Sequence, residues 1–424
     1  MTLQKEIDLS VVIPAWNEGK NVGPLVAGLW KNINALGLSA EIIIADGGSS
    51  DETCEEAIKN GARVILQRRL GYGGALREGF MQASGKYVLT MDCDLSHPPD
   101  LLPSLWQGRE IAEVTVASRF VAGGQSAAPL GRKVLSRILN FVFSSVLSVP
   151  LKDSSSGYRL YRRDVLHPAR YDRENFNVLQ EILVKAYSEG FTIREVPLNY
   201  EERVHGASHV SLVKFALSYL PTLFNLWKLR NSPAAADYEY RAYNSRHPVQ
   251  RFWIRKRVAL LQKMAGDKGS LLDIGCGSSY FTAATPSAVG LDIEPGKVRF
   301  LRQKGAQAVE GRAEALPFPD ESFERVVISQ LLPRVSDPKV VIDEARRVLK
   351  KGGTLVVAVP DSRRLGWRMI GAFYRMLPNV KAFASQHSFS RGSLVDLLAD
   401  CGFRALKYRY IFGSELILSA IRVE

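Results

Sequence analysis

Short apolar runs alternate with longer stretches of helical periodicity, and several of the apolar runs end in acidic or glycine-rich segments. Residues 8–18 contain a buried strand that stops at a proline and continues into polar residues. Residues 41–53 repeat this pattern with acids on both sides of a Gly/Ser turn, and residues 86–94 repeat it with two aspartates. Parallel strands deliver the side chains that follow them to one edge of a sheet. The three segments therefore predict one ligand-binding edge in an α/β fold.

The same pattern begins again in the second half of the chain. Residues 271–279 contain a strand that runs into a glycine turn, and residues 289–294 end a second strand with an acid. Between the two halves, residues 228–237 are small and polar around a proline, which is typical of a linker. A chain of 424 residues is long enough for two cores. We therefore predict an α/β protein with two Rossmann-like domains, residues 1–230 and 231–424.

Asp92 and Asp94 carry the most specific chemical signal, because they stand two residues apart directly after an apolar strand. Mg²⁺ and Mn²⁺ prefer hard oxygen ligands, and in proteins they often take only one or two carboxylates, with phosphate and water completing the shell. The pair therefore predicts a site for Mg²⁺ or Mn²⁺ that holds a diphosphate. The expected ligand is a nucleotide-sugar.

Five further blocks follow in order, and the chain carries them as residues 70–80 (LGYGGALREGF), 118–120 (SRF), Arg132 with Ser136, 152–159 (KDSSSGYR) and 195–208 (EVP leading to RVHGAS). Together with the strand ends they resemble the inverting glycosyltransferase family 2, specifically its dolichol-phosphate mannose synthase branch, over about residues 8–211. The resemblance implies transfer of a hexose from a nucleotide-sugar to polyprenyl or dolichyl phosphate. GDP-mannose is the first expected donor, and UDP-glucose is the alternative.

The resemblance also implies roles for particular residues. Those that would hold the nucleoside come from the first two strand ends, and they are Pro14, Asn17, Glu18, Asp46 and Asp51. Asp92 would also contact the nucleotide-sugar, and Asp92 and Asp94 would bind the metal that bridges the diphosphate. A cation at that position stabilises the negative charge that develops on the leaving group. Asp94 is therefore also predicted to be catalytic.

Three arginines are candidates for positioning the acceptor phosphate, namely Arg119, Arg132 and Arg203. Guanidinium groups bind phosphate through two donors and stay charged, so we expect these residues to be catalytic as well as acceptor-binding. Ser136, one helical turn after Arg132, would add a hydroxyl donor on the same face. His209 stands where the family usually has a lysine, so a fixed positive charge is missing there.

A net charge of +13 is compatible with phosphate-rich substrates, an anionic membrane or nucleic acid. Residues 130–149 and 211–228 form amphipathic stretches with cations and aromatic residues, which predicts helices lying in a membrane interface. Two ordinary packed helices are the alternative. The second stretch is too short and too interrupted for a confident span, and no transmembrane helix is expected. Four scattered cysteines indicate free thiols, and no signal peptide is visible, so we expect a peripheral or monotopic enzyme on the cytoplasmic face.

The second half contains further ordered motifs, in residues 271–279, 289–294, 313–327 and 341–355. They resemble the class I S-adenosylmethionine-dependent methyltransferases over about residues 238–424. The resemblance implies S-adenosylmethionine as cofactor, and the residues that would bind it are Asp273, Gly275, Gly277, Asp292, Ala313 and Glu314. Two departures are Ser279 in place of the usual third glycine, and Arg312 where an acid commonly faces the adenine amine.

The basic segment that opens the second domain, near residues 238–265, is predicted to be a helical lid over the methyl-donor pocket. Contact with anionic lipid or a nucleic acid is the alternative. The methyl acceptor is expected to be a related glycan or lipid intermediate. His387 is a candidate base, but a loop histidine without a catalytic role is the favoured interpretation. Arg312 also favours a second hypothesis, a regulatory module without transfer activity. An RNA methyltransferase is a third, but phosphate substrates and membrane account for the charge, so no nucleic-acid partner is expected.

Overall fold

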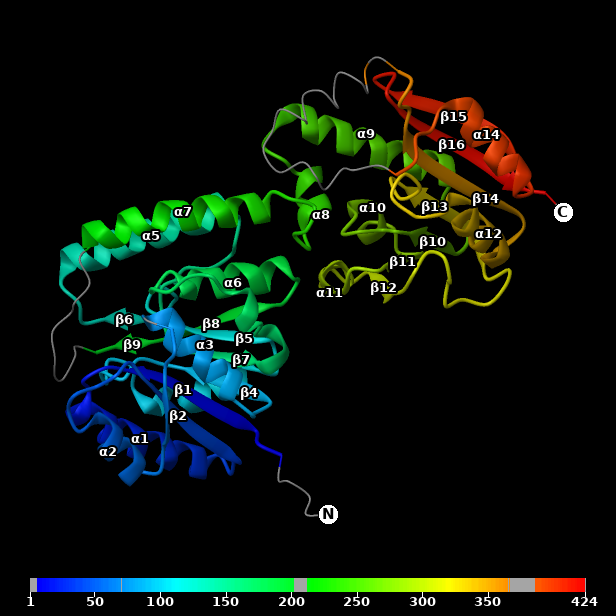
Figure 1. Cartoon of the computed structure of the whole chain (residues 1–424). Helices are drawn as coiled ribbons and strands as arrows, with labels where there is room; N and C mark the ends of the chain where they lie inside the picture. Colours follow the sequence, from blue (N-terminus) through cyan, green and yellow to red (C-terminus); the bar gives the residue numbers. More distant parts are fainter. Residues whose placement is uncertain (1–5, 70, 202–211, 365, 367–385, 424) are drawn as a thin grey trace. The chain divides into compact units, whose positions relative to one another are not determined.

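The computed structural model describes residues 6–69, 71–201, 212–364, 366 and 386–423 (Figure 1). The chain divides into two compact units. The first comprises residues 1–187 and 191–230, and the second comprises residues 188–190 and 231–424. Each unit is built around its own seven-stranded sheet. The prediction of an α/β chain with two Rossmann-like sheets is therefore confirmed.

The sheet of the first unit has the order β3-β2-β1-β4-β7-β5-β8. Its strands are β1 (Leu9–Ala15), β2 (Ala40–Asp46), β3 (Arg63–Leu66), β4 (Tyr87–Thr90), β5 (Val114–Ser118), β7 (Arg159–Arg162) and β8 (Ile193–Pro197). Only β7 among these seven strands runs antiparallel to both of its neighbours. A small second sheet pairs β6 (Gln125–Ser126) with β9 (Asn199–Tyr200). Because β1, β2 and β4 are parallel, the segments that follow them meet at one edge.

Helices cover both faces of this sheet, because successive residues of each strand point to opposite sides. Val11 and Ile13 of β1 join a core formed with α1 (Gly19–Ala35), α2 (Thr53–Lys59) and α4 (Leu102–Gly108). Val12 faces the other core, formed with α3 (Tyr72–Gln82), α5 (Leu130–Leu147), α6 (Val178–Ser188) and the end of α7 (Leu212–Arg230). The sheet is thereby buried on both sides, which fixes the positions of its strand ends.

Helices α5 and α7 lie side by side over the first unit (Figure 1). The ring of Phe143 in α5 meets that of Tyr219 in α7 edge to face, with 6.3 Å between centroids. The last residue of α7 is the buried Arg230, and its guanidinium donates a hydrogen bond to the Leu147 carbonyl at 3.0 Å. Helix α7 therefore extends to Arg230, into the segment that the sequence pattern assigned to the linker, and α8 begins at Tyr238.

The outer faces of α5 and α7 expose large apolar side chains. In the described part of these helices they are Leu130, Val134, Leu135, Ile138, Phe141, Val142, Val146, Leu220, Phe224 and Trp227. Inward-facing residues such as Phe143 and Leu147 are buried. Over the residues that the structure describes, no helix combines the length and the apolar character that crossing a membrane requires.

The sheet of the second unit has the order β12-β11-β10-β13-β14-β16-β15. Its strands are β10 (Leu271–Ile274), β11 (Ala288–Asp292), β12 (Gln307–Glu310), β13 (Phe323–Ser329), β14 (Leu349–Pro360), β15 (Phe403–Ile411) and β16 (Glu415–Arg422). The first five strands in this order, which end at β14, are mutually parallel. Strand β16 is antiparallel to both β14 and β15. One face is covered by α12 (Pro338–Val348) and α14 (Arg391–Asp400), and the other by α9 (Pro248–Ala265) and α10 (Tyr280–Ala283).

The segment predicted as one helical lid is divided into two helices. Helix α8 (Tyr238–Tyr243) contacts the glycine loop, because the Glu239 carboxylate accepts a hydrogen bond from the Ser278 hydroxyl at 2.6 Å. Helix α9 buries Val258, Leu261 and Ala265 in the core beneath the sheet. Of these two helices α8 contacts the glycine loop, while α9 packs into the core, so α8 is the part of the segment that fits the predicted lid.

Two candidate active sites at the carboxyl edges of the sheets

The loops after β1 and β2 are tied together by side chains predicted to hold a nucleoside. The Asp46 carboxylate, at the end of β2, accepts hydrogen bonds from the backbone N–H groups of Gly48 and Ser49, both at 2.9 Å, and from the Ser49 hydroxyl at 2.5 Å. Asn17 adopts a left-handed backbone with φ 54°, and its side-chain oxygen accepts from the Ser50 N–H at 2.9 Å. These bonds fix the shape of both loops at the carboxyl edge.

The remaining predicted nucleoside residues lie at the same edge. The Asp51 carboxylate accepts from the backbone N–H groups of Gly19 at 3.0 Å and Thr53 at 3.1 Å. The Glu18 N–H donates to the Thr53 hydroxyl at 2.8 Å. Pro14 is half-buried within β1 and pairs in register with Ala45. Much of the hydrogen-bonding capacity of these acids is used to shape the loops.

The two aspartates predicted to bind the metal follow β4 and differ in burial. Asp92 is half-buried and accepts a hydrogen bond from the Tyr72 hydroxyl at 2.9 Å. Asp94 is buried, and one of its oxygens accepts from the Ser96 N–H at 3.1 Å and the Ser96 hydroxyl at 2.5 Å. Leu95 between Asp94 and Ser96 has φ 61°, so the chain turns sharply here. Both carboxylates are thereby oriented by neighbouring donors.

The pair fits a divalent cation whose other ligands come from the substrate. Among the described residues, no group of three or more His, Cys, Asp or Glu side chains is arranged to hold a metal ion. Two oxygen-donating carboxylates suit Mg²⁺ or Mn²⁺ when phosphate and water supply the remaining ligands. Gly157 leaves room beside them, since an added Cβ would lie 3.0 Å from a carboxylate oxygen of Asp92.

Sequence reasoning missed the roles of Tyr72 and His97 around this pair. His97 is buried, and its Nδ1 accepts a hydrogen bond from the Asp92 N–H at 3.2 Å. Burial lowers the pKa of His97 although Asp92 and Asp94 attract its proton, so the ring is neutral near neutral pH and Nδ1 can accept. The available signals were the position of His97 five residues after Asp92, and that of Tyr72 in the glycine-rich block.

Arg119 is held by a buried carboxylate that was given no role. The Arg119 Nε and one Nη atom donate to the two oxygens of Asp153, both at 2.8 Å, and the same Nη donates to the Ser155 hydroxyl at 2.7 Å. Burial by itself would raise the pKa of Asp153, but the hydrogen bond and charge of Arg119 outweigh it and hold that pKa below its usual value. One edge of the guanidinium is therefore committed to Asp153.

Helix α5 joins this cluster to the other predicted acceptor residues. Asn140 donates to the Ser136 carbonyl at 2.9 Å and to the Ser155 hydroxyl at 3.2 Å. Arg132 is exposed one turn before the half-buried Ser136 on the same helix. Arg203 and His209 lie outside the described residues.

The glycine loop after β10 has the backbone that the sequence required there. Gly275 and Gly277 have φ values of 68° and 56°, in the left-handed region that favours glycine. A Cβ on Gly275 would lie 2.8 Å from the Leu331 side chain. The Gly277 N–H donates to Asp292 at 2.7 Å, and the other Asp292 oxygen accepts from the Glu294 N–H at 2.9 Å. The loop is thus fixed against the end of β11, and a backbone of this kind fits the close approach of a nucleoside cofactor.

Further charged residues surround this loop. Glu239, which sequence reasoning missed, pairs with Lys297 at 3.0 Å. Arg312 approaches Glu314 at 3.6 Å and is mostly exposed, whereas Ala313 is buried. Arg312, which stands where an acid commonly faces the adenine amine, thus lies beside the Glu314 carboxylate. The candidate base His387 places Nε2 3.1 Å from the Ser336 carbonyl oxygen.

Asp273 is buried beneath the loop and should make the stability of the second unit depend on pH. Its Oδ2 accepts from the Thr282 hydroxyl at 2.5 Å, while Oδ1 has no hydrogen-bond partner among the residues that the structure describes. Burial, opposed by Thr282 and reinforced by the charge of Asp292, raises the pKa of Asp273 to about 7. A carboxyl whose pKa is raised in the folded state stabilises the fold fully only below its unfolded pKa, and this contribution is lost as pH rises through the folded pKa.

We expect Asp273→Asn to match the wild type near pH 4 and to be more stable above pH 7, by roughly 4 kcal/mol, since each pKa unit corresponds to about 1.4 kcal/mol. Hydrogen exchange of β10, measured from pH 4 to 8, reports the free energy of unfolding of this unit. Parallel pH profiles for the two proteins would contradict the burial of an unpaired carboxyl.

The two sheets define a chain with two α/β domains, and two family models identify it as a transferase. A model described as glycosyl transferase family 2 matches residues 10–168, and one described as a methyltransferase domain matches residues 272–357. A dolichyl-phosphate hexose transferase of Haloferax volcanii is 32% identical over 200 residues, covering 46% of this chain and 84% of that protein. The chain therefore belongs to glycosyl transferase family 2, and it carries a methyltransferase domain after the family 2 domain.

Two other likenesses are more limited. A dolichol-phosphate mannosyltransferase of Pyrococcus furiosus is 32% identical over 233 residues, 52% of this chain, and the match spans 64% of that protein's own length. A SAM-dependent methyltransferase of Thermotoga maritima, described as a possible histamine N-methyltransferase, is 21% identical, with 44% of this chain and 99% of that chain covered and a TM-score of 0.37.

Proposed function

We propose that the first unit transfers a hexose from a nucleotide-sugar to polyprenyl or dolichyl phosphate, with inversion at the anomeric carbon. The names of the two family 2 relatives, a dolichyl-phosphate hexose transferase and a dolichol-phosphate mannosyltransferase, support this reaction. Mannose from GDP-mannose is the proposed donor sugar, and glucose from UDP-glucose is the alternative. The single observation that carries the proposal is the pair Asp92 and Asp94, oriented by neighbouring donors at the edge that also carries the β1 and β2 loops.

In this proposal the residues at the edge bind and orient the donor. Asp92 and Asp94 would hold Mg²⁺ or Mn²⁺, which supplies positive charge against the departing diphosphate. Asn17, Glu18 and Asp51 would contact the nucleoside through the faces that their loop hydrogen bonds leave open. His97 would fix the backbone of Asp92, and Tyr72 would fix its carboxylate. These contacts would hold both carboxylates in place for the metal, which would stabilise the negative charge of the departing diphosphate.

The acceptor phosphate would be positioned by the arginine cluster. It is anionic at neutral pH, so it needs placement more than it needs a base. Arg119 would bind it with the N–H groups that Asp153 does not occupy, and Asp153 would act as a positioning residue through Arg119. Arg132 and Ser136 would approach from α5, and Arg203 is proposed from its sequence position alone.

We also propose that α5 and α7 lie on the membrane that holds the lipid acceptor, as a peripheral or monotopic attachment on the cytoplasmic face. Their exposed faces are rich in aliphatic and aromatic side chains. Exposed apolar patches of this kind mark interaction surfaces. Trp227 and Lys228 stand near the end of α7, where residues at headgroup level are expected.

The second unit is proposed to bind S-adenosylmethionine and to methylate a related glycan or lipid-linked intermediate. The backbone of Gly275 and Gly277 would receive the cofactor, and Asp292 would meet the ribose. Asp273, Ala313 and Glu314 would complete the pocket. A regulatory unit without methyl transfer is the second candidate, because Arg312 brings a cation beside Glu314.

One experiment tests both units. Labelled GDP-mannose and UDP-glucose are offered to a short polyprenyl phosphate with Mg²⁺ or Mn²⁺, and the lipid fraction is then incubated with methyl-labelled S-adenosylmethionine. Metal-dependent sugar label in the lipid identifies the donor, and methyl label in the same lipid identifies the acceptor. No sugar label with either donor would overturn the polyprenyl-phosphate reaction. Cofactor binding without methyl transfer to any glycan or lipid fraction would favour the regulatory unit.

A further inference from the structure

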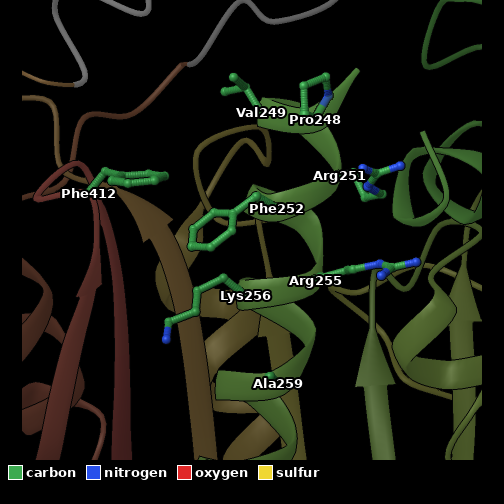
Figure 2. Close-up of a pocket in the computed structure, with 8 residues that line it drawn as sticks. All are labelled: Pro248, Val249, Arg251, Phe252, Arg255, Lys256, Ala259 and Phe412. Carbon is green, nitrogen blue, oxygen red and sulfur yellow. The ribbon is translucent and has the colours of Figure 1, made fainter. Parts of the chain in front are cut away.

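Helix α9 of the second unit lines an open groove that neither proposed reaction uses. The groove has a volume of about 700 Å³. Its lining residues are Pro248, Val249, Arg251, Phe252, Arg255, Lys256, Ala259 and Phe412. We call it the α9 groove, and Figure 2 shows Phe252 and Phe412 facing each other across it. Its lining contains apolar and cationic side chains and no acid.

The apolar part of the α9 groove is exposed to an unusual degree. Val249 is 73% exposed, Phe412 63% and Phe252 52%. The rings of Phe252 and Phe412 lie 5.4 Å apart between centroids. Pro248, Phe252 and Ala259 recur at spacings of four and seven residues, so they form one stripe along the helix. Three large exposed apolar side chains around one groove are the composition of a binding surface.

Cations flank the apolar stripe on both sides. Arg251 and Arg255 are one turn apart along one side, and Lys256 lies on the other side with Val249. Within the described residues, none of these three cations makes an ion pair with an acidic side chain. Residues 241–266 contain seven Lys or Arg and no Asp or Glu. The groove therefore presents uncompensated positive charge next to apolar surface.

The packing of α9 keeps its apolar stripe exposed. The Glu415 carboxylate accepts from Trp253 Nε1 at 2.6 Å, and it pairs with Arg257 at 2.5 Å. Further along α9, Val258 and Leu261 are buried in the core. Helix α9 cannot turn its apolar stripe inward without breaking the Glu415 contacts and exposing this core. The exposure of Phe252 and Val249 is thus a property of the packed structure.

We propose that the α9 groove is a docking site for an anionic membrane surface. An apolar stripe flanked by cations matches the boundary between lipid headgroups and acyl chains, where apolar side chains insert and cations meet headgroup phosphates. Two copies of the same cationic face would repel each other, which disfavours self-association through the groove. The site is separate from the proposed contact of α5 and α7, so it stands or fails independently of the proposed function.

The test follows deuterium exchange of α9 and of residues 411–415 in the full-length protein. Vesicles of phosphatidylcholine alone are compared with equimolar phosphatidylcholine and phosphatidylglycerol. We expect protection of both segments by the anionic vesicles only. Arg251→Gln/Arg255→Gln/Lys256→Gln should raise the lipid concentration needed for protection on the order of 100-fold, since each cation near an anionic surface contributes about fivefold. Phe252→Ser should weaken the same protection without changing its dependence on salt.

A matched variant removes three cations elsewhere in the same unit. Lys351, Arg404 and Lys407 are exposed, and their replacement by Gln lowers the net charge equally. This variant should retain most of the protection. Equal loss in both triple variants, equal protection by neutral vesicles, protection by RNA in place of vesicles, or protection that rises with protein concentration alone would each overturn the proposal. Protection of α5 and the transfer of sugar are read separately, so failure of the proposed function is distinguishable.

Discussion

In the proposed reactions, Asp94→Asn is expected to lower the rate of sugar transfer at least about 100-fold while methyl transfer by the second unit stays unchanged. The substitution keeps the shape of the side chain and its ability to accept from Ser96, but it removes the negative charge. A metal that neutralises a leaving diphosphate supplies several kcal/mol of stabilisation, and about 1.4 kcal/mol corresponds to a factor of ten in rate. Initial rates measured against Mg²⁺ or Mn²⁺ concentration check the effect.

The matched control is Asp100→Asn in the same segment. Asp100 is exposed and accepts a hydrogen bond from the Asn32 side chain at 3.0 Å, away from the Asp92 and Asp94 carboxylates. It should retain near wild-type transfer. If Asp94→Asn keeps full activity with an unchanged metal requirement, the metal is bound elsewhere and the predicted role of Asp94 is wrong.

Asp153→Ala should lower the free energy of unfolding of the first unit by about 3–5 kcal/mol, because it leaves the largely buried Arg119 without its partner. The Asp153 side chain is fully buried, and that of Arg119 is 17% exposed. The variant should also bind the acceptor phosphate poorly, since Arg119 would lose its fixed orientation. Denaturant unfolding gives the first effect, and the KM for polyprenyl phosphate gives the second.

The same unit contains an exposed pair of the same geometry. Arg162 donates through Nε to one oxygen of Asp164 at 2.6 Å and through Nη2 to the other at 2.9 Å. Exposed pairs contribute at most about 1 kcal/mol, because water solvates both charges when they separate. Asp164→Ala is therefore expected to change stability little. Equal losses in the two variants would show that burial does not set the strength of the Arg119 pair.

The sequence predicted the features that depend on residues close together along the chain. Parallel strands that end in polar residues specify an edge, so the fold class and the meeting of the β1, β2 and β4 loops followed from the pattern of apolar runs. The left-handed glycine loop after β10 was likewise predictable, because only glycine adopts that backbone readily. Whether Asp92, Asp94 and the nucleoside residues act as proposed stays a prediction for the assays above.

Contacts between distant segments were not predictable in the same way. Asp153 lies 34 residues from Arg119 in sequence, and no periodicity links the two positions. Such partners are selected by the packed fold, which a single sequence does not display. The boundary between α8 and α9 is a different case, because polar residues and Pro248 mark it in the sequence and proline is favoured in the first turn of a helix.

Phe412, at the turn between β15 and β16, combines a strained backbone with a ring that gains little burial on folding. Its φ of 47° is one that glycine or asparagine adopts with less strain, and its ring is largely exposed. Replacement by asparagine should therefore make the hairpin more stable by about 1 kcal/mol while removing one wall of the α9 groove. If the α9 groove docks on a membrane as proposed, Phe412 is a position where a less stable turn is exchanged for a more complete binding surface.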